Sequence, residues 1–416
     1  MTTTSARVAP PDIRSPAFKA DPWPACARVR AEQPVVRIPL ANAHLAGGHQ
    51  EAYLVTRYED AAAVLRDERF IKDFRAVGAL SMHRRPWLPK ALEPLTRTML
   101  DTDGAVHRRL RNLVRDTFAP RYTEQLEPRI QALTDELLDR MAAKGRADLV
   151  ADYALQLPLT VIAEIMGVSP RDRMRFRGWV TKLFLTQTAP RQGLATLLML
   201  PTALTMMRFL RRLVSERRAH PRDDLVSRLA TMEDGGDRLS EDELMSMVAI
   251  LLIAGYETTV NLIATGTLLL LGHPDQLARL RAEPDLIAST VEELLRLATP
   301  VDVATERYAS EDLQVGGVAI PAGSLVLVAI VSANADEGHF PEPDCLDVGR
   351  GENRHLAFGM GPHYCLGAPL ARLEGRIALG SLVRRFPDLR LAVPAAELRW
   401  RPGMTLRGLT SLPVVL

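Results

Sequence analysis

The stretch from Leu239 to Leu271 constrains the fold more than any other part of the chain. A capping box and a hydrophobic staple over Leu239–Leu244 mark a helix start, and Gly272 and Pro274 end the helix about 45 Å further on, at about 1.5 Å per residue. Because this helix is apolar on nearly every side, it must be buried in a sizeable core. A transmembrane alternative would place Glu257 near the middle of a bilayer, at a cost of about 2.5 kcal/mol or more. We therefore favour a core helix.

The middle of this helix carries residues that a plain core helix does not require. Gly255 costs about 1 kcal/mol relative to alanine inside a helix, and Thr258 can donate its hydroxyl to the carbonyl of Ala254, four residues back. Leu251, Ala254 and Thr258 share one face, so a groove with the hydroxyl pointing into it is expected there. Close helix packing is the alternative role for Gly255 and Thr258, but it does not account for a buried Glu257 beside them.

A glycine-rich turn with one cysteine follows in His355–Glu374, which reads H-L-A-F-G-M-G-P-H-Y-C-L-G-A-P-L-A-R-L-E. Gly359 and Gly361 permit backbone angles that other residues resist, and the apolar spacing that follows predicts a helix. Cys365 therefore lies just before or on a first helical turn. Free backbone N–H groups and the helix dipole favour a thiolate bound to a cation at that place. For this cysteine taken alone, a buried structural role is the alternative.

The composition predicts a mainly α protein with small β-sheets. Hydrophobic residues make up 47% of the 416 residues, and Leu and Ala, two strong helix formers, are abundant. The net charge of +2 does not indicate a nucleic-acid partner. Three scattered cysteines favour a reducing compartment, and residues 1–24 contain neither a signal-type apolar segment nor a membrane span. We therefore expect a cytoplasmic protein without a membrane anchor.

The rest of the chain divides into elements without a linker, an internal repeat or a low-complexity segment. A flexible segment, 1–20, is expected to precede a single domain, 21–416. Strands are predicted at 35–39, at 52–58 and within 301–330. Helices are predicted at 23–32, 58–66, 123–144, 151–167, 171–186 and 194–207, the last interrupted at Pro201. The irregular stretch 70–97 is either functional or a surface loop with scattered apolar residues.

Two charged pairs stand at helical spacing. His107 and Arg111 are four residues apart before the central helix, and Glu293 and Arg296 are three apart after it. Side chains at these spacings meet on one helix face. Either pair alone is also typical of a solvated surface or of chance. Their weight comes from their order along the chain relative to the central helix and to Cys365.

Taken in this order, the features resemble those of the cytochrome P450 family. The spacing Phe358-x-x-Gly361-x-x-x-Cys365-x-Gly367 is similar to the heme-binding loop of that family, and the resemblance covers about residues 20–416. It implies the cytochrome P450 fold, heme b as the cofactor and Cys365 as the ligand of its iron. It also implies a set of cofactor-binding residues, in which the first four contact the heme propionates: His107, Arg111, Arg307, His355, Phe358, Gly359, Cys365 and Gly367.

The resemblance assigns further roles. Glu257 and Thr258 match an acid–alcohol pair in which the alcohol positions dioxygen and a water, while the acid passes protons inward from solvent. Glu293 and Arg296 match a structural ion pair. Cys345 occupies the place of its usual third member and cannot supply the charge, so Arg350 is the expected substitute. The implied substrate pocket comprises Leu251, Ala254, Gly255, Val301, Ala304, Leu409 and Thr410.

The implied activity is that of a monooxygenase that uses dioxygen to hydroxylate or epoxidise a hydrophobic small molecule, such as a secondary-metabolite intermediate. Two electrons come from NAD(P)H through a separate ferredoxin and ferredoxin reductase, because the chain has no flavin or iron–sulfur segment of its own. A monomer is expected. Four arginines flank the expected proximal face and are predicted to dock an acidic ferredoxin: Arg108, Arg109, Arg115 and Arg372.

Several other functions remain open at this point. One is a peroxide-driven heme oxygenase, in which Glu257 and Thr258 would be superfluous, and another is a non-catalytic heme-thiolate gas sensor or ligand-binding protein. A cysteine hydrolase would have to pair Cys365 with the nearby His363. A zinc site lacks ligand pairs at the usual spacing.

Overall fold

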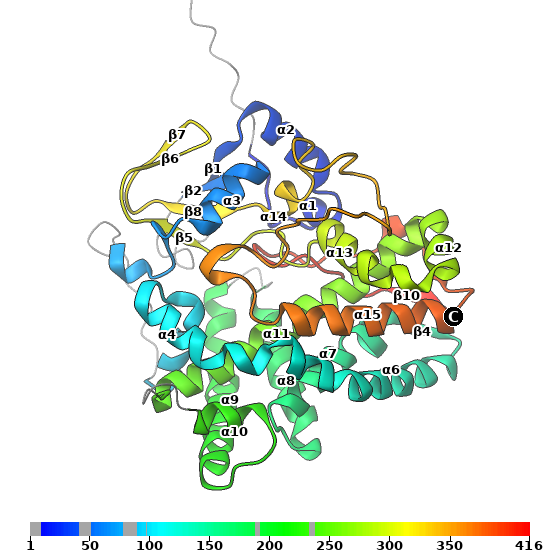
Figure 1. The fold of residues 1–416 in the computed structure, drawn as a ribbon, viewed down its shortest axis with the longest axis horizontal. Coiled ribbons are helices and arrows are strands. Elements are labelled where there is room, and N and C mark those ends of the chain that lie inside the picture. Colours follow the sequence, from blue (N-terminus) through cyan, green and yellow to red (C-terminus); the bar gives the residue numbers. More distant parts are fainter. Residues whose placement is uncertain (1–9, 41–50, 78–89, 97, 188–191, 233–237) are drawn as a thin grey trace, which may run out of the picture.

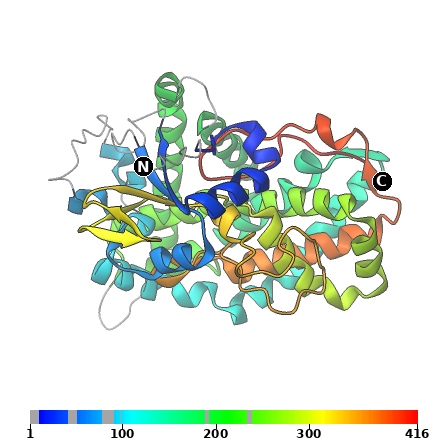
Figure 2. The same cartoon turned by 90° about the horizontal axis from the view of Figure 1, so that it is seen from above.

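The computed structural model describes residues 10–40, 51–77, 90–96, 98–187, 192–232 and 238–416. Helices fill most of the molecule (Figures 1 and 2). The five-stranded and two-stranded sheets lie at one side, whereas the three-stranded sheet β4-β10-β9 lies beside the C-terminus. The predicted mainly α architecture with small sheets is thus confirmed. The helices are α1 (Pro16–Ala20), α2 (Trp23–Glu32), α3 (Tyr58–Arg66), α4 (Gly104–Arg115), α5 (Pro120–Thr123), α6 (Glu127–Ala142), α7 (Gln156–Ile165), α8 (Pro170–Gln187), α9 (Gln192–Ala219), α10 (Leu225–Thr231), α11 (Glu241–Gly272), α12 (Pro274–Ala282), α13 (Ile287–Ala298), α14 (Ile330–Ala333) and α15 (Ala368–Arg385).

The central helix α11 begins with the expected capping box. The hydroxyl of Ser240 accepts a hydrogen bond from the Glu243 N–H at 3.2 Å, and the Glu243 carboxylate accepts one from the Ser240 N–H at 2.9 Å. In length and composition α11 could cross a membrane, but 67% of its most apolar window is buried inside the protein. It is therefore a core helix, as predicted.

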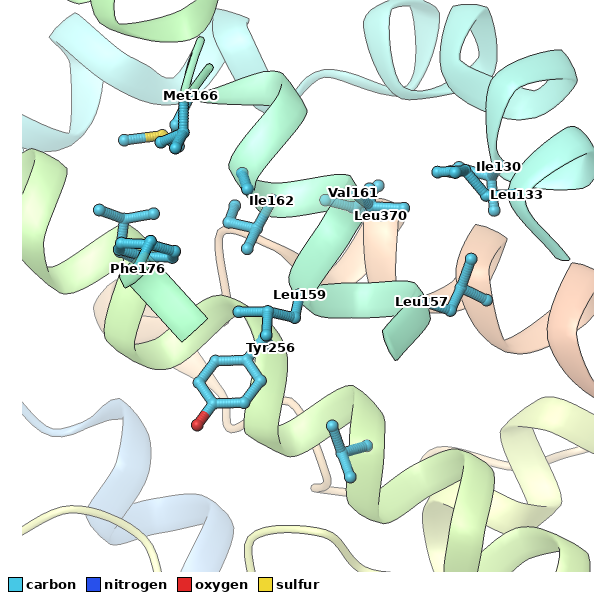
Figure 3. Packing of buried hydrophobic residues seen from close by; sticks show 14 of the residues in the cluster. Ile130, Leu133, Leu157, Leu159, Val161, Ile162, Met166, Phe176, Tyr256 and Leu370 are labelled. Atoms are coloured by element: carbon cyan, nitrogen blue, oxygen red, sulfur yellow. The ribbon is translucent and has the colours of Figure 1, made fainter. Parts of the chain in front are cut away.

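Helix α7 covers one side of α11. Gly255 of α11 is the point of close approach, because a Cβ atom there would lie 3.3 Å from Cδ1 of Ile162. Figure 3 shows Leu157, Leu159 and Ile162 of α7 between α11, which carries Tyr256, and the helix that carries Ile130 and Leu133, α6. The structure thus shows that Gly255 allows close packing of two helices, which was the alternative role considered for it.

Helices α13 and α15 cover another side of α11. Gly375 of α15 marks this contact, since an added Cβ would lie 3.1 Å from Leu262 of α11 and 3.2 Å from Val291 of α13. Side chains at protein-interior density leave no room for that methyl group. The start of α15, immediately after Cys365, is therefore fixed relative to the middle of α11.

The largest sheet has the strand order β1-β2-β8-β5-β3, with β2 and β8 parallel and the other neighbours antiparallel. The predicted strand 35–39 is confirmed, whereas the predicted strand 52–58 ends at Val55 because Tyr58 already begins α3. The Tyr58 N–H donates to Asp336 at 2.7 Å, which supplies that helix start with an acceptor. The strands are β1 (Val35–Pro39), β2 (Glu51–Val55), β3 (Phe70–Ile71), β4 (Arg146–Asp148), β5 (Arg307–Ala309), β6 (Leu313–Val315), β7 (Val318–Ile320), β8 (Leu325–Val328), β9 (Arg390–Leu391) and β10 (Pro413–Val415).

The predicted flexible N-terminal segment is wrong for Pro16–Ala20, which form α1. Lys19 is fully buried there, and its ammonium group lies 2.5 Å from a carboxylate oxygen of Asp302. A buried charge is tolerated only with a partner, so this pair attaches α1 to the protein interior.

Two further predictions change in the structure. Helix α9 continues through Pro201 instead of breaking there, and Ala203, Met206 and Leu210 are buried along its inner side. Tertiary packing thus outweighs the backbone hydrogen bond that proline removes. The irregular stretch 70–97 contains β3 and 3-10 turns at Phe74–Val77 and Lys90–Thr96, and its apolar residues at 78–89 lie outside the described residues.

The Glu293–Arg296 pair is fully buried, with 2.7 Å between Oε1 and Nη2. Arg350 is its third member, as predicted, and its Nε lies 3.1 Å from both carboxylate oxygens. Both arginines also donate to the carbonyl oxygen of Cys345 at 3.2 Å. Cys345 thus contributes a backbone acceptor, and the missing charge comes from Arg350.

Replacing Glu293 by glutamine should lower the free energy of unfolding by about 3–5 kcal/mol, because two guanidinium groups would lose their shared buried carboxylate. Urea unfolding followed by circular dichroism measures this loss. Arg385→Ala is the control: its pair with Asp139 is more than half exposed on both sides, so about 1 kcal/mol or less should be lost. Equal losses in the two variants would contradict the role of the buried network.

Candidate active site

The turn before α15 requires glycine at one position above all. Gly361 has a φ of +72°, and a Cβ atom there would lie 2.7 Å from the carbonyl oxygen of Leu65 in α3. Past this contact, the Cys365 N–H donates to the carbonyl of Phe358 at 2.9 Å. Gly367 is the N-cap of α15, so Cys365 lies just before the first helical turn, as predicted.

The sulfur of Cys365 is accessible and has protein on most sides. Burial raises the pKa of its thiol, while the Gly367 N–H and the guanidinium groups of Arg111 and Arg372 act in the opposite direction. Backbone donors lie at the helix start as the sequence analysis expected, but desolvation outweighs their effect on the pKa of the thiol. A thiolate at this place fits the ligand of a bound metal cation, whose charge compensates the burial.

A second cluster of basic groups lies beside the turn. His107 and His363 face each other with ring centroids 4.1 Å apart, and both line a cavity of about 230 Å³ together with Arg307. Burial is the main cause that lowers the pKa of His107 to about 4 and that of Arg307 to about 10. Lys72 is also buried beside Arg307, and burial lowers its pKa as well.

The chain compensates these buried basic groups only in part, since Asp103 acts on His107, Arg307 and His363 but does not offset their burial. Arg307 donates to the Thr305 carbonyl at 3.2 Å, and no described carboxylate forms an ion pair with it. His363 approaches Asp103 only at 3.5 Å. The cluster therefore fits the acidic side chains of a porphyrin, which would supply the missing negative charge.

The predicted propionate partners separate into two groups. His107 and Arg307 meet at this cavity. Arg111 instead donates to the Tyr364 carbonyl at 2.8 Å, and His355 lies 3.2 Å from Glu292, which Arg372 also binds. His363, which the sequence analysis considered only as a partner for a nucleophilic cysteine, takes the place expected for His355. The position of His363, two residues before Cys365, could have indicated from the sequence that it lies near the cysteine turn. Nothing in the sequence around Lys72 indicated that it lies near Arg307.

The side of α11 that carries Leu251, Ala254 and Thr258 is accessible, as the sequence analysis expected. Thr258 donates its hydroxyl to the Ala254 carbonyl at 3.2 Å. Ala254 is exposed and Leu251 and Thr258 are half-buried, although the helix turns that follow are buried. This face is where a substrate or dioxygen could meet the hydroxyl.

The side chain of Glu257, next to Thr258, lies against Arg401 in the interior of the protein. Its side chain is buried, and Arg401 donates to it at 2.7 Å. Burial raises the pKa of Glu257 to about 7, although Arg401 lowers it in part. A carboxyl group with this pKa can take up and release a proton near neutral pH.

The residues of the predicted substrate pocket differ in exposure. Val301 and Ala304 are half-buried and Thr410 is exposed. Leu409, however, is 1% exposed and pairs with Trp400 in the core, so it does not line a pocket. Gly255 is also excluded, since it faces α7. Val301 also forms an isolated antiparallel bridge with Leu406.

The predicted ferredoxin-docking arginines all have acidic partners. Arg108 pairs with Glu68, Arg109 with Glu243, Arg115 with Asp116 and Arg372 with Glu292. The side chains of Arg109 and Arg372 are each 33% exposed. A groove of about 510 Å³ lies beside Arg372 and also contains the exposed Arg376.

The alternative of a zinc site gains no support. Within the described part of the chain, no group of three or more His, Cys, Asp or Glu side chains is placed to hold a metal ion. A metal at Cys365 would therefore have one protein ligand among the described residues, which fits a metal that a cofactor already holds.

The family pattern described as Cytochrome P450 matches residues 182–389. A protein described as cytochrome P450 107B1 from Saccharopolyspora erythraea is 44% identical over 404 residues, 96% of each chain. This chain belongs to the cytochrome P450 family. Cytochrome P450 monooxygenase PikC from Streptomyces venezuelae is 44% identical over 95% of this chain and 91% of its own. The structure of the Bacillus subtilis bacillaene cytochrome P450 PksS has a TM-score of 0.88, with 38% identity over 97% of this chain and 99% of that one.

This cytochrome P450 is accordingly a heme-binding monooxygenase of the bacterial type, which acts on hydrophobic small molecules with electrons from redox partner proteins. The family assignment agrees with the accessible Cys365 and with the only partly compensated basic cluster. It confirms the predicted fold, family and activity class.

Gly361→Ala should destabilise this cytochrome P450 by about 1–3 kcal/mol, through a strained φ and the clash with the Leu65 carbonyl. It should also lower the ratio of heme to protein, because the turn that carries Cys365 would shift. Thermal unfolding and the heme-to-protein absorbance ratio measure the two effects. Gly351→Ala is the matched control, since nothing lies within 4 Å of its added Cβ. An unchanged heme ratio in Gly361→Ala would contradict the proposed constraint.

Proposed function

We propose that Cys365 is the axial ligand of heme b, and that His107, Arg307 and His363 hold the heme propionates. The accessible Cys365 sulfur at the start of α15 carries this proposal. Bound heme supplies the iron that activates dioxygen, and a thiolate ligand increases electron donation to that iron. The Gly367 and Ala368 N–H groups moderate that donation by binding the sulfur.

Glu257 and Thr258 are the proposed catalytic residues of oxygen activation. Glu257, with a pKa of about 7, carries a proton from the protein side of α11. The Thr258 hydroxyl lies on the accessible side, where it can exchange its hydrogen bond with the Ala254 carbonyl for one with dioxygen or water. With heme bound, protons supplied through these two side chains would favour oxygenation of the substrate over release of peroxide. This pair favours the monooxygenase over a peroxide-driven enzyme or a gas sensor.

The proposed substrate is a polyketide-derived macrolactone or a related secondary-metabolite intermediate. Relatives include proteins named 6-deoxyerythronolide B hydroxylase, 40% identical, and mycinamicin IV hydroxylase/epoxidase, 43% identical. Leu251, Ala254 and Val301 give the accessible region an apolar lining, which fits a largely hydrophobic ring. A vitamin D(3) 25-hydroxylase is also 41% identical, so a sterol is the competing class.

The proposed electron route runs from NAD(P)H through a ferredoxin reductase and a ferredoxin. The groove beside Arg372 and Arg376 is the proposed docking place, because an acidic ferredoxin would find exposed positive charge there, close to α15. Residues 21–416 are proposed to form a single heme domain that acts as a cytoplasmic monomer without a membrane anchor.

Reduced wild-type protein exposed to carbon monoxide should show the Soret band that gives the family its name. Cys365→Ala should lose that band, because no other residue can supply the thiolate. Difference absorption spectra measure it. Cys345→Ala is the control, since Cys345 is exposed and lies away from the turn. A Soret band at the wild-type position in Cys365→Ala would contradict the proposal that Cys365 is the axial ligand.

A panel of macrolactones, sterols and fatty acids tests the substrate class. We expect macrolactones to shift the Soret band at the lowest concentrations. With ferredoxin, ferredoxin reductase and NADPH, they should also yield a product that carries one added oxygen atom. Mass spectrometry of that product is the second readout. Tighter binding and turnover of a sterol or a fatty acid would contradict the macrolactone assignment.

A further inference from the structure

The acid of the proposed proton relay is held by a segment far away in the sequence. Arg401 lies in the hairpin 399–410 near the C-terminus, and its Nη1 donates to Oε1 of Glu257 at 2.7 Å. Its Nη2 donates to Oδ1 of Asn261 at 2.6 Å. Glu257 and Asn261 are one helical turn apart on α11, so a single guanidinium group spans both side chains.

The hairpin is built to present this guanidinium group. The Arg401 N–H donates to the Gly408 carbonyl at 2.9 Å, and Trp400 pairs with Leu409. Gly408 must be glycine, because an added Cβ would lie 2.6 Å from Nη2 of Arg401 and closer still to the Asn261 amide. The close approach of the hairpin to α11 is thus specific to the place where Arg401 binds.

Arg407 connects the same hairpin to the N-terminal part of the chain. Its Cζ lies 4.5 Å from the centroid of the Trp400 ring and 5.1 Å from that of Trp23. Its guanidinium group is buried and donates to backbone carbonyls, including that of Lys19 at 2.7 Å. The position of Arg401 is therefore set by the folded core and not by a loose surface chain.

Glu257 has unused hydrogen-bonding capacity on its other side. Its Oε2 is buried and has no partner within the described part of the chain, and the same holds for Nδ2 of Asn261. The Arg401 side chain, in contrast, is 28% exposed, while that of Glu257 is 8% exposed. The hairpin thus provides contact with solvent on the Arg401 side of a carboxyl group that is otherwise enclosed.

We propose that Arg401 is a positioning residue that fixes the orientation and the ionisation of Glu257, so that the C-terminal hairpin controls the proton supply to Thr258. This inference rests on the proposed role of Glu257 in proton delivery. Arg401 is the charged group that faces Glu257, and Tyr256, on the same helix, is the neighbouring titratable group. When Arg401 is bound, the pKa of Glu257 is about 7, so its carboxyl group can take up and release a proton near neutral pH. When Arg401 moves toward solvent, the uncompensated carboxyl group retains that proton.

The sign of the effect on stability follows from burial. The pKa of Glu257 in the folded protein is about 7, above its ordinary value of 4.5. The folded state therefore binds more protons than the unfolded state between these values, and stability falls as the pH rises through this range. Loss of Arg401 raises the folded-state pKa further, so the fall extends to higher pH.

Arg401→Gln tests the proposal on the heme-loaded protein without turnover. Infrared difference spectra against Glu257→Gln report the protonated carboxyl band of Glu257, and its titration midpoint should move upward by at least one pH unit. The loss in thermal midpoint relative to wild type should be greater at pH 8 than at pH 5.5. This pH dependence should vanish when Glu257→Gln is also present. Arg401→Lys should restore part of the shift, because it returns a positive charge.

Two further variants distinguish loss of the contact between Arg401 and Glu257, which we call the clamp, from general damage to the hairpin. Arg399→Gln removes a charge from an exposed residue of the same hairpin and should leave the midpoint unchanged. Gly408→Ala keeps every charge but pushes Arg401 away from α11, so it should raise the midpoint as Arg401→Gln does. A wild-type midpoint in both Arg401→Gln and Gly408→Ala would overturn the proposal.

Turnover with a substrate provides the functional readout. Arg401→Gln should lower the fraction of NADPH electrons recovered in product, increase peroxide, and move the pH profile of this fraction upward. If the carboxyl midpoint moves but Glu257→Gln retains wild-type coupling, the clamp is supported and the proposed catalytic role of Glu257 is wrong. If Glu257→Gln uncouples turnover while the Arg401 variants behave as wild type in both assays, the clamp is wrong and the role of Glu257 stands.

Discussion

The rest of the structure depends on burying α11, a helix too apolar to face water along most of its length. Helices α7, α13 and α15 meet this requirement, and each contact is close enough to need a small residue at the crossing. Gly255 meets α7, and Gly375 of α15 meets α11. Because these approaches leave no freedom for sliding, the start of α15 and the middle of α11 keep a fixed relation. Thr258 lies on α11 and Cys365 directly precedes α15, so the packing of these two helices fixes where the two residues lie relative to each other.

Two carboxylates buried on or beside α11, Glu257 and Glu293, each pair with a guanidinium group that comes from another segment of the chain. Glu293 is buried with Arg296 and Arg350, and this network connects α13 to the segment that leads to the cysteine turn. Glu257 is buried with a single guanidinium group from the C-terminal hairpin. In the first case two guanidinium groups share one buried carboxylate, and the shared hydrogen bonds hold the three side chains in one arrangement. In the second, one partly exposed cation faces a carboxyl group with a raised pKa, which suits a group that exchanges protons.

Local chemistry explains which predictions from the sequence succeeded. The capping box at Ser240, the hydroxyl bond of Thr258 and the turn at Gly361 each depend on residues that are neighbours in the chain, and all three occur as predicted. The break expected at Pro201 did not occur, because the buried side of α9 favours a continuous helix. Leu409 was assigned to the pocket from its place in the chain, and only the pairing with Trp400 shows that it belongs to the core.

The sequence by itself determined the central helix, the cysteine turn and the family, since these follow from periodicity, capping and a spacing within one segment. Only the tertiary structure decided which distant side chains meet. It brought His363, and not His355, to the basic cavity, and it placed Arg401 on Glu257, 144 positions earlier in the chain. The physical reason is that an ion pair between remote segments leaves no periodic trace in the sequence. It forms because burial makes an unpaired charge costly, and burial is a property of the folded chain.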